Sequence, residues 1–274
     1  MRLVVQRCLG ASLLLEEASG RRAEVGRGLV VLVSLGEGSS SALVSRAADA
    51  VLQLPLSTTG EWGDGSKSLS ALKVRMGGQA QSVLLIPQAC LTSEARGRSL
   101  KYHKQLERTL GLRLFCELEA ALSGAAQRGL LELAFRHEGA FALLSPLLPA
   151  DLAFGAHWGA YDARGVPTHD RAGQELPKAE RKRLDALWKL LDGALRAAAL
   201  LRAARALVEQ ARRANSGVPE AEAELARLEQ DAPADALRAA AHSPIDVVAG
   251  TFGGRQGLRL DAELGPSTHV LSFD

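Results

Sequence analysis

The sequence has few of the residues that mark several common classes of protein. It contains three cysteines in 274 residues, and they are far apart, with no CxxC spacing of the kind that binds zinc or forms a redox pair. No stretch of eighteen uncharged apolar residues occurs, and Arg7 interrupts the signal-like opening. These absences predict a soluble cytoplasmic protein in a reducing compartment, with no membrane span.

An excess of charge of one sign is missing as well. The chain carries 33 basic and 31 acidic residues, a formal net charge of +2, so any contact with nucleic acid must come from a local basic patch. His137 and His157 accompany Asp151 and Asp162, but their spacings are irregular, and we expect no metal and no cofactor. Hydrophobic residues make up 47% of the chain, which is enough for a core in one or two domains.

The two ends of the chain have the pattern of one mixed α/β unit. Apolar runs next to glycine or turn residues predict strands, and apolar residues at helical spacing predict helices. The strands are expected over residues 2–17, 26–36, 81–91, 245–254, 256–264 and 267–273, and the helices over residues 39–54 and 110–122. The last three strands are too few for an independent domain, so they should complete the sheet of the first unit.

The segment between these ends, residues 123–242, is different in kind. It is rich in Ala, Arg, Leu and Glu, and a leucine stripe predicts a helix over residues 178–214 that ends at Asn215 and is followed by Pro219. A second helical part follows, which predicts a helical hairpin. We therefore expect an α/β fold with a mixed β-sheet and flanking helices, interrupted by a mainly helical insertion.

The predicted domains follow from this pattern. Residues 1–122 and 243–274 form one discontinuous α/β domain, and residues 123–242 form the insertion. Within the insertion, residues 130–177 are apolar without a clear period. An ordered subdomain, a mobile insertion and a wrongly retained coding segment remain open for them.

A basic segment follows the strand expected over residues 81–91. It contains Arg96, Arg98, Lys101, His103 and Lys104 within nine positions. Clustered cations beside the end of a strand favour a phosphate contact. A solvated surface loop explains the same composition, so both interpretations stay open at this point.

Four short motifs occur in order along the chain. They are Val4-Val5-Gln6-Arg7, Pro87-Gln88-Ala89-Cys90-Leu91, Gly250-Thr251-Phe252-Gly253 and Gly265-Pro266-Ser267-Thr268. Each is weak alone, but their combination resembles the D-aminoacyl-tRNA deacylase family over residues 1–122 and 243–274. The resemblance implies a deacylase-like fold for the α/β domain and a hydrolase that removes amino acids from mischarged tRNA.

The details of the motifs divide between two branches of this family. Pro87, Ala89 and the basic segment are more similar to the animal-type paralogue, which removes L-alanine wrongly attached to a threonine tRNA. Arg7 is similar to the main branch, which acts on D-aminoacyl esters. D-aminoacyl and small L-aminoacyl substrates therefore both remain open.

The resemblance also implies how such a site works. The family forms a homodimer in which the Gly265-Pro266 pair of one subunit would enter the active site of the other. Glycine permits close approach and proline fixes φ, so this pair can present a rigid carbonyl wall to the substrate, in a cis or a trans form that Arg7 helps to select. Backbone N–H groups near residues 88–90 are the expected oxyanion donors, and the terminal 2′-OH of the tRNA is expected to help activate water.

The candidate site residues follow from the motifs and the basic segment. Those assigned to catalysis are Gln88, Ala89, Cys90, Gly265 and Pro266. Those assigned to substrate or tRNA binding are Arg7, Pro87, Arg96, Arg98, Lys101, His103, Phe252 and Thr268.

Two alternatives stay open beside this assignment. Cys90 is expected to line the site, but with His103 or His269 it is also a candidate nucleophile. The rival function is a catalytically weak RNA-binding or scaffold protein that retains the deacylase fold.

Overall fold

A mixed β-sheet is the centre of the molecule. The computed structural model describes residues 1–17, 19–57, 68–102, 104–152, 158–262 and 268–274. Within them the strand order is β10-β1-β3-β4-β9, and β2 and β11 also pair with β1. The strands are β1 (Arg2–Glu16), β2 (Arg21–Val25), β3 (Gly28–Ser34), β4 (Ser82–Pro87), β9 (Asp246–Ala249), β10 (Leu258–Ala262) and β11 (Thr268–Ser272).

Strand β1 organises the sheet because it is long enough to pair with four neighbours. Its first half lies between β3 and β11, and its second half lies between β2 and β10. Strand β9 pairs in parallel with β4. The last three strands therefore belong to the same sheet as the first, as the sequence predicts.

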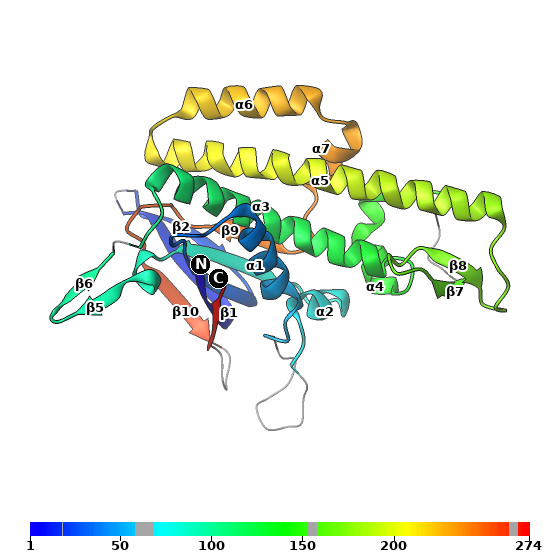
Figure 1. The fold of residues 1–274 in the computed structure, drawn as a ribbon, viewed down its shortest axis with the longest axis horizontal. Coiled ribbons are helices and arrows are strands. Elements are labelled where there is room, and N and C mark those ends of the chain that lie inside the picture. Colours follow the sequence, from blue (N-terminus) through cyan, green and yellow to red (C-terminus); the bar gives the residue numbers. More distant parts are fainter. Residues whose placement is uncertain (18, 58–67, 103, 153–157, 263–267) are drawn as a thin grey trace.

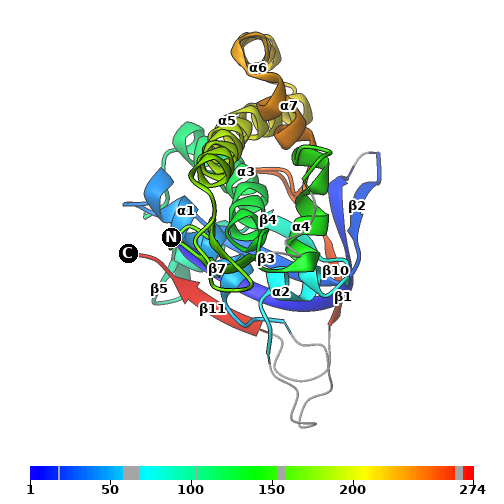
Figure 2. The same ribbon diagram turned by 90° about the vertical axis from the view of Figure 1, so that its right-hand side faces the viewer.

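The principal helices cover one face of this sheet. They are α1 (Ser41–Gln53), α2 (Ala71–Met76), α3 (Arg108–Leu133) and α5 (Lys178–Ala214). Figure 2 shows them in layers, with α3 next to the sheet, α5 beyond α3 and α6 (Val218–Asp231) outermost. Alternate residues of β1, such as Leu3 and Val5, face the helices and are fully buried against α1 and α3. The opposite face has a second, smaller core that includes Cys8, Leu13 and Leu84.

Helix α3 is longer than its predicted range of 110–122. It begins at Arg108, after Glu107 accepts hydrogen bonds from the first backbone N–H groups, and it continues to Leu133. Ser123 and Gly124 resemble a helix end in the sequence. The buried stripe nevertheless continues through Leu130, because α5 packs against this part of α3.

The segment 123–242 has the predicted helical hairpin. Helix α5 spans the predicted residues, and Asn215 ends it in the left-handed conformation, with φ of 49°. Helix α6 then folds back along α5 (Figure 1), and Val208, Ala211 and Ala221 are buried between the two. Helix α7 (Ala234–Ala241) returns the chain to β9.

The described part of residues 130–177 forms regular structure. It contains α4 (Glu138–Leu144), the 3-10 turn η2 (Ser145–Leu147) and a hairpin of β7 (Trp158–Tyr161) and β8 (Pro167–Asp170). A small core of Phe135, Val166, Leu176 and Leu184 joins this hairpin to α5. The three alternatives for this segment stay predictions. No described helix of the chain combines the length and the apolar content that a membrane crossing requires.

Candidate active site

A pocket of about 600 Å³ lies where three parallel strands end. Strands β3, β4 and β9 run parallel, so their carboxyl ends meet at one edge of the sheet, where α/β proteins commonly bind ligands. The lining comes from these strand ends, the segment before α3 and the first turns of α3. It consists of Val33, Ser34, Leu35, Pro87, Gln88, Ala89, Cys90, Tyr102, Gln105, Leu106, Arg108, Gly111, Phe115, Phe252, Gly253 and Gly254.

Five of the predicted site residues meet in this pocket. Pro87 is the last residue of β4, Gln88, Ala89 and Cys90 follow it directly, and Phe252 comes from the loop after β9. Strand β4 stops here because the chain turns into a short 3-10 helix, η1 (Ala89–Thr92). The two motifs are more than 150 positions apart in the sequence, and the parallel pairing of β4 with β9 brings them together.

The backbone around Ala89 is held firmly in one orientation. The N–H of Gln88 donates to the carbonyl of Val33 at 2.7 Å, so it is engaged within the sheet. The carbonyl of Ala89 accepts from Ser34 Oγ at 3.2 Å and from Gln105 Nε2 at 3.0 Å. In a trans peptide the N–H of Cys90 points away from that carbonyl. Because Ala89 and Cys90 open a helix, their N–H groups have no acceptor within it.

Cys90 is the exposed one of the three cysteines. Its Sγ lies 2.9 Å from Gln88 Nε2, which donates to it. The described lining of the pocket includes no histidine, and His269 lies on β11 opposite Val5. Cys8 and Cys116 are buried, and burial raises the pKa of both thiols, that of Cys116 to about 12.

An aromatic pair forms one wall of the pocket. The rings of Phe252 and Phe115 lie 5.5 Å apart between centroids and are tilted by 45°. Gly111 lets the ring approach α3 closely, since a Cβ at this position would lie 3.1 Å from Phe252 Cζ. Phe115 itself is fully buried in the main core. The wall is therefore continuous with the packed interior.

The basic segment forms a hairpin, in contrast to the loop that the sequence suggests. Strands β5 (Glu94–Arg96) and β6 (Ser99–Lys101) project from the molecule (Figure 1), and Tyr102, which follows β6, lines the pocket. Arg96, Arg98 and Lys101 are exposed along this hairpin. Lys104 hydrogen-bonds to the Glu94 carboxylate and lowers its pKa, and Arg96 adds to this effect. The three predicted tRNA contacts thus lie on a projecting element and outside the pocket.

Two other predicted residues lie on β1 and on its neighbour β11. Arg7 is buried opposite Leu29 of β3, and its positive charge adds to burial in lowering the pKa of His269. Thr268 is exposed on β11, where Gln6 Nε2 donates to its Oγ1 at 3.3 Å. Neither residue lines the pocket of the described chain. His103, Gly265 and Pro266 lie outside the described residues.

Several pocket residues were not singled out from the sequence. Gly253 belongs to the Gly250–Gly253 motif, Gly254 follows it, and Tyr102 lies between the predicted residues Lys101 and His103, so proximity to the motifs is the signal that would have assigned them to the site. Ser34 and Gln105 donate to the Ala89 carbonyl from distant segments, and no local sequence pattern predicts these contacts. Among the described residues, no group of three or more His, Cys, Asp or Glu side chains is placed to hold a metal ion.

The fold and the pocket together define an α/β protein with a site at the carboxyl ends of its parallel strands, and comparisons with known proteins specify its family. The sequence model described as D-Tyr-tRNA(Tyr) deacylase matches residues 4–142. D-aminoacyl-tRNA deacylase 2 of Homo sapiens is 32% identical over 130 residues, which cover 44% of this chain and 72% of that protein. Its counterpart in Danio rerio is 30% identical over 118 residues, or 42% of this chain and 68% of that protein.

A solved structure described as a probable eukaryotic D-amino acid tRNA deacylase is also similar. It is 18% identical with a TM-score of 0.49, and the match covers 98% of this chain and 97% of that chain. From the family match and the curated relatives, the chain belongs to the D-Tyr-tRNA(Tyr) deacylase family. It is accordingly a hydrolase of the ester bond of aminoacyl-tRNA.

Proposed function

We propose that this chain is a proofreading deacylase that hydrolyses the ester between a mischarged amino acid and the terminal ribose of its tRNA. The observation that carries the proposal is the convergence of residues 87–90 and Phe252 in one pocket. A volume of about 600 Å³ is in the range of sites that hold small ligands, and it suits an aminoacyl group with its ribose. The amino acids proposed are D-residues, glycine and small L-residues such as L-alanine.

The proposed chemistry depends on the backbone and on the tRNA. Water attacks the ester carbonyl, the 2′-OH of the terminal ribose helps to take its proton, and the 3′-oxygen leaves with a proton. The N–H groups of Ala89 and Cys90 receive the oxyanion, because both open η1 and line the pocket. The N–H of Gln88 is excluded from this role because it is bonded to Val33.

Cys90 lines the pocket in this scheme and does not attack the ester. We expect Cys90→Ala to keep kcat within about threefold of wild type, because the backbone N–H is retained and the scheme has no covalent step. Single-turnover hydrolysis of the best substrate is the measurement. A loss of several orders of magnitude would instead assign Cys90 the role of nucleophile.

The β5–β6 hairpin is the proposed contact for the tRNA backbone. Its cations Arg96, Arg98 and Lys101 are exposed, and Tyr102 connects the hairpin to the pocket. Replacing all three cations by Ala should weaken tRNA binding. The slope of log Kd against log salt should also become shallower by roughly 0.7–0.9 for each phosphate that is no longer neutralised, because fewer counterions are released. Filter binding over a salt series measures the slope.

A matched triple variant controls for the change in net charge. Arg196→Ala, Arg227→Ala and Arg238→Ala remove three exposed cations from α5, α6 and α7. For this triple variant, the slope of log Kd against log salt should equal that of the wild type. If the hairpin variant also kept the wild-type slope, the hairpin would be excluded from the interface.

The Gly265-Pro266 pair is proposed to act in a second copy of the chain. Ala262 pairs with Cys8 and Thr268 pairs with Gln6, so β10 ends and β11 begins beside Arg7. The pocket lies beyond the other end of this part of β1, where Arg2 donates to the carbonyl of Leu91. Five residues of strand separate Arg2 from Arg7, roughly 16 Å. A connection of five residues that is anchored at both ends reaches roughly half of its extended length of about 17 Å, which is less than this separation and supports a homodimer with crossed sites.

We propose the same domain boundaries that the sequence predicts. Residues 1–122 and 243–274 form the deacylase domain, and residues 123–242 form an insertion. The return of β9, β10 and β11 to the first sheet supports this division. Because α3 is continuous across position 122, a deletion that respects the structure should begin after Leu133.

Hydrolysis of three matched substrates tests the proposed function. They are a D-aminoacyl-tRNA, a glycyl-tRNA and an L-alanyl-tRNA, each incubated with the purified protein. Cleavage of the first two alone would indicate a wall that rejects L-residues, and cleavage of all three would indicate a pocket open to a small L-side chain. Cleavage of none would contradict the proposal and leave the RNA-binding or scaffold role.

A further inference from the structure

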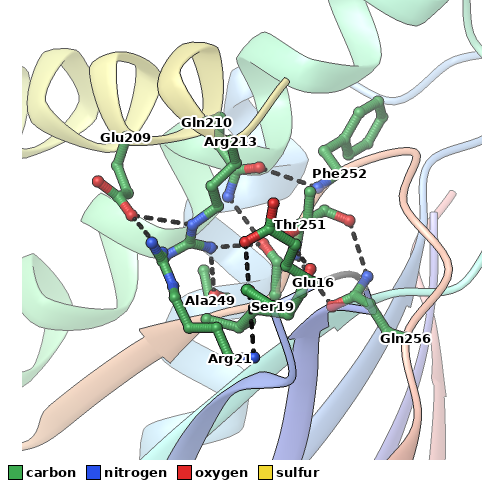
Figure 3. Close-up of polar contacts among 12 residues, drawn as sticks. Glu16, Ser19, Arg21, Glu209, Gln210, Arg213, Ala249, Thr251, Phe252 and Gln256 are labelled. Atoms are coloured by element: carbon green, nitrogen blue, oxygen red, sulfur yellow. Dashed lines mark hydrogen bonds and ion pairs between the residues drawn. The ribbon is translucent and has the colours of Figure 1, made fainter. Parts of the chain in front are cut away.

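The loop that carries Phe252 into the pocket is held by a side chain from the helical segment. Gln210, near the end of α5, is 3% exposed. Its Nε2 donates to the carbonyl of Gly250 at 2.7 Å, and its Oε1 accepts from the N–H of Phe252 at 2.9 Å. Figure 3 shows this amide above the loop. Strand β9 ends the described sheet order, so one glutamine amide bonds the loop backbone as a neighbouring strand would.

Ion pairs fix α5 at the position from which Gln210 acts. Arg213 Nη1 donates to the carbonyl of Ala249 at 2.8 Å, and Arg213 Nε lies 3.0 Å from Glu209 Oε1. Glu209 also pairs with Arg21 of β2 at 3.0 Å. The chain Arg21, Glu209 and Arg213 therefore ties α5 to β2 and to the end of β9, beside the loop (Figure 3).

The opposite side of the loop is closed by Gln256. Its Oε1 accepts from the N–H of Thr251 at 2.9 Å, and its Nε2 donates to the carbonyl of Thr251 at 2.7 Å. Thr251 Oγ1 donates to the carbonyl of Leu15 at 3.2 Å. Thr251 is thus held by residues of the α/β unit. The Phe252 N–H depends on Gln210, and the Gly250 carbonyl accepts both from Gln210 and from Arg213 Nη1 at 3.2 Å.

We propose that Gln210 is a positioning residue for the deacylase reaction, and this inference rests on the proposed function. Through Gly250 and Phe252 it sets the place of the Phe252 ring against Phe115 and Gly111. Phe252 lines the same pocket as the η1 backbone that is proposed to receive the oxyanion. The helical segment therefore completes the wall that aligns the ester with its donors.

The kinetic consequence separates positioning from simple stability. Without the amide, the Phe252 N–H loses its acceptor and the Gly250 carbonyl keeps only its 3.2 Å hydrogen bond from Arg213 Nη1, so the loop shifts to find other partners. Misalignment of the ester by about 1 Å costs roughly 100-fold in rate. The tRNA body is still bound at the β5–β6 hairpin, so KM should change little.

The experiment compares two buried glutamines in the full-length protein. Gln210→Met keeps the volume of the side chain and removes both hydrogen bonds. Gln127→Met is the matched control, because Gln127 is fully buried and donates to the carbonyls of Ala239 at 3.0 Å and His242 at 2.7 Å, away from the pocket. We expect Gln210→Met to lower kcat roughly 10- to 100-fold with KM within about twofold, and Gln127→Met to leave kcat unchanged where both are folded.

A second variant covers the case in which Gln210→Met does not fold. Gln210→Glu keeps the acceptor for the Phe252 N–H and loses the donor to Gly250, so it should recover part of the lost kcat. Equal kcat for the Gln210 and Gln127 variants, or a loss confined to KM, would overturn the inference while the proposed function stands. If the wild-type protein cleaved none of the three substrates, both the inference and the proposed function would be overturned. That result would be known before any variant is compared.

Discussion

Ala89→Pro should lower kcat for ester hydrolysis by about 10²- to 10³-fold, which is the usual cost of losing one oxyanion donor. Proline lacks the N–H that we assign to the oxyanion and changes little else at this point. Ala89 is the first residue of η1, a position that tolerates proline because its N–H has no acceptor in the helix. Gln88, with φ of −138° and ψ of 85°, is already outside the helical region that a following proline disfavours.

Single-turnover kinetics on an aminoacyl-tRNA measures this effect. Ala89→Gly and Ala89→Ser keep the N–H and should retain most of the activity, and thermal unfolding of all three variants checks that the fold is intact. A folded Ala89→Pro variant with wild-type kcat would remove the Ala89 N–H from the mechanism.

Phe115→Ala should lower the free energy of unfolding by roughly 3–5 kcal/mol, the usual cost of truncating a buried phenylalanine. The Phe115 side chain has 0% of its surface accessible to solvent, and its ring contacts that of Phe252. Its truncation therefore leaves a void in the core and removes the support of the pocket wall. Denaturation by urea, followed by circular dichroism, measures the change.

Phe141→Ala is the matched comparison. Phe141 packs against the same core from α4 but is only partly buried, and it does not line the pocket. Its truncation should cost less, because it removes less buried apolar surface. A loss below about 1 kcal/mol for Phe115→Ala would mean that the surrounding side chains close the void.

The sequence predicts an element well when the residues of that element alone determine its bounds. The bounds of α5 follow from its leucine stripe and from Asn215, because a periodic apolar face and a left-handed cap are both visible in the sequence. The β5–β6 hairpin also has a local signal, although the sequence prediction treated this segment as a loop. Gly97 has φ of 62° at the first position of a two-residue turn, a place that favours glycine.

The sequence was less informative where neighbours decide the outcome. Helix α3 continues past Gly124 because α5 covers it, and the length of a helix under tertiary packing is not a local property. The motif residues at positions 87–90 and Phe252 were placed by a family resemblance, but their supports were not. Ser34, Gln105 and Gln210 act across contacts between distant segments, so only the structure identifies them.

Because the three thiols differ in burial, a thiol reagent can label the pocket selectively. Cys90 is exposed at the pocket, whereas Cys8 and Cys116 are buried, and burial raises the pKa of both. Alkylation requires the thiolate, so a maleimide at neutral pH should modify the native protein once, at Cys90. A fluorophore attached there provides an optical signal for the arrival of an RNA end, in a protein whose sequence is otherwise unchanged.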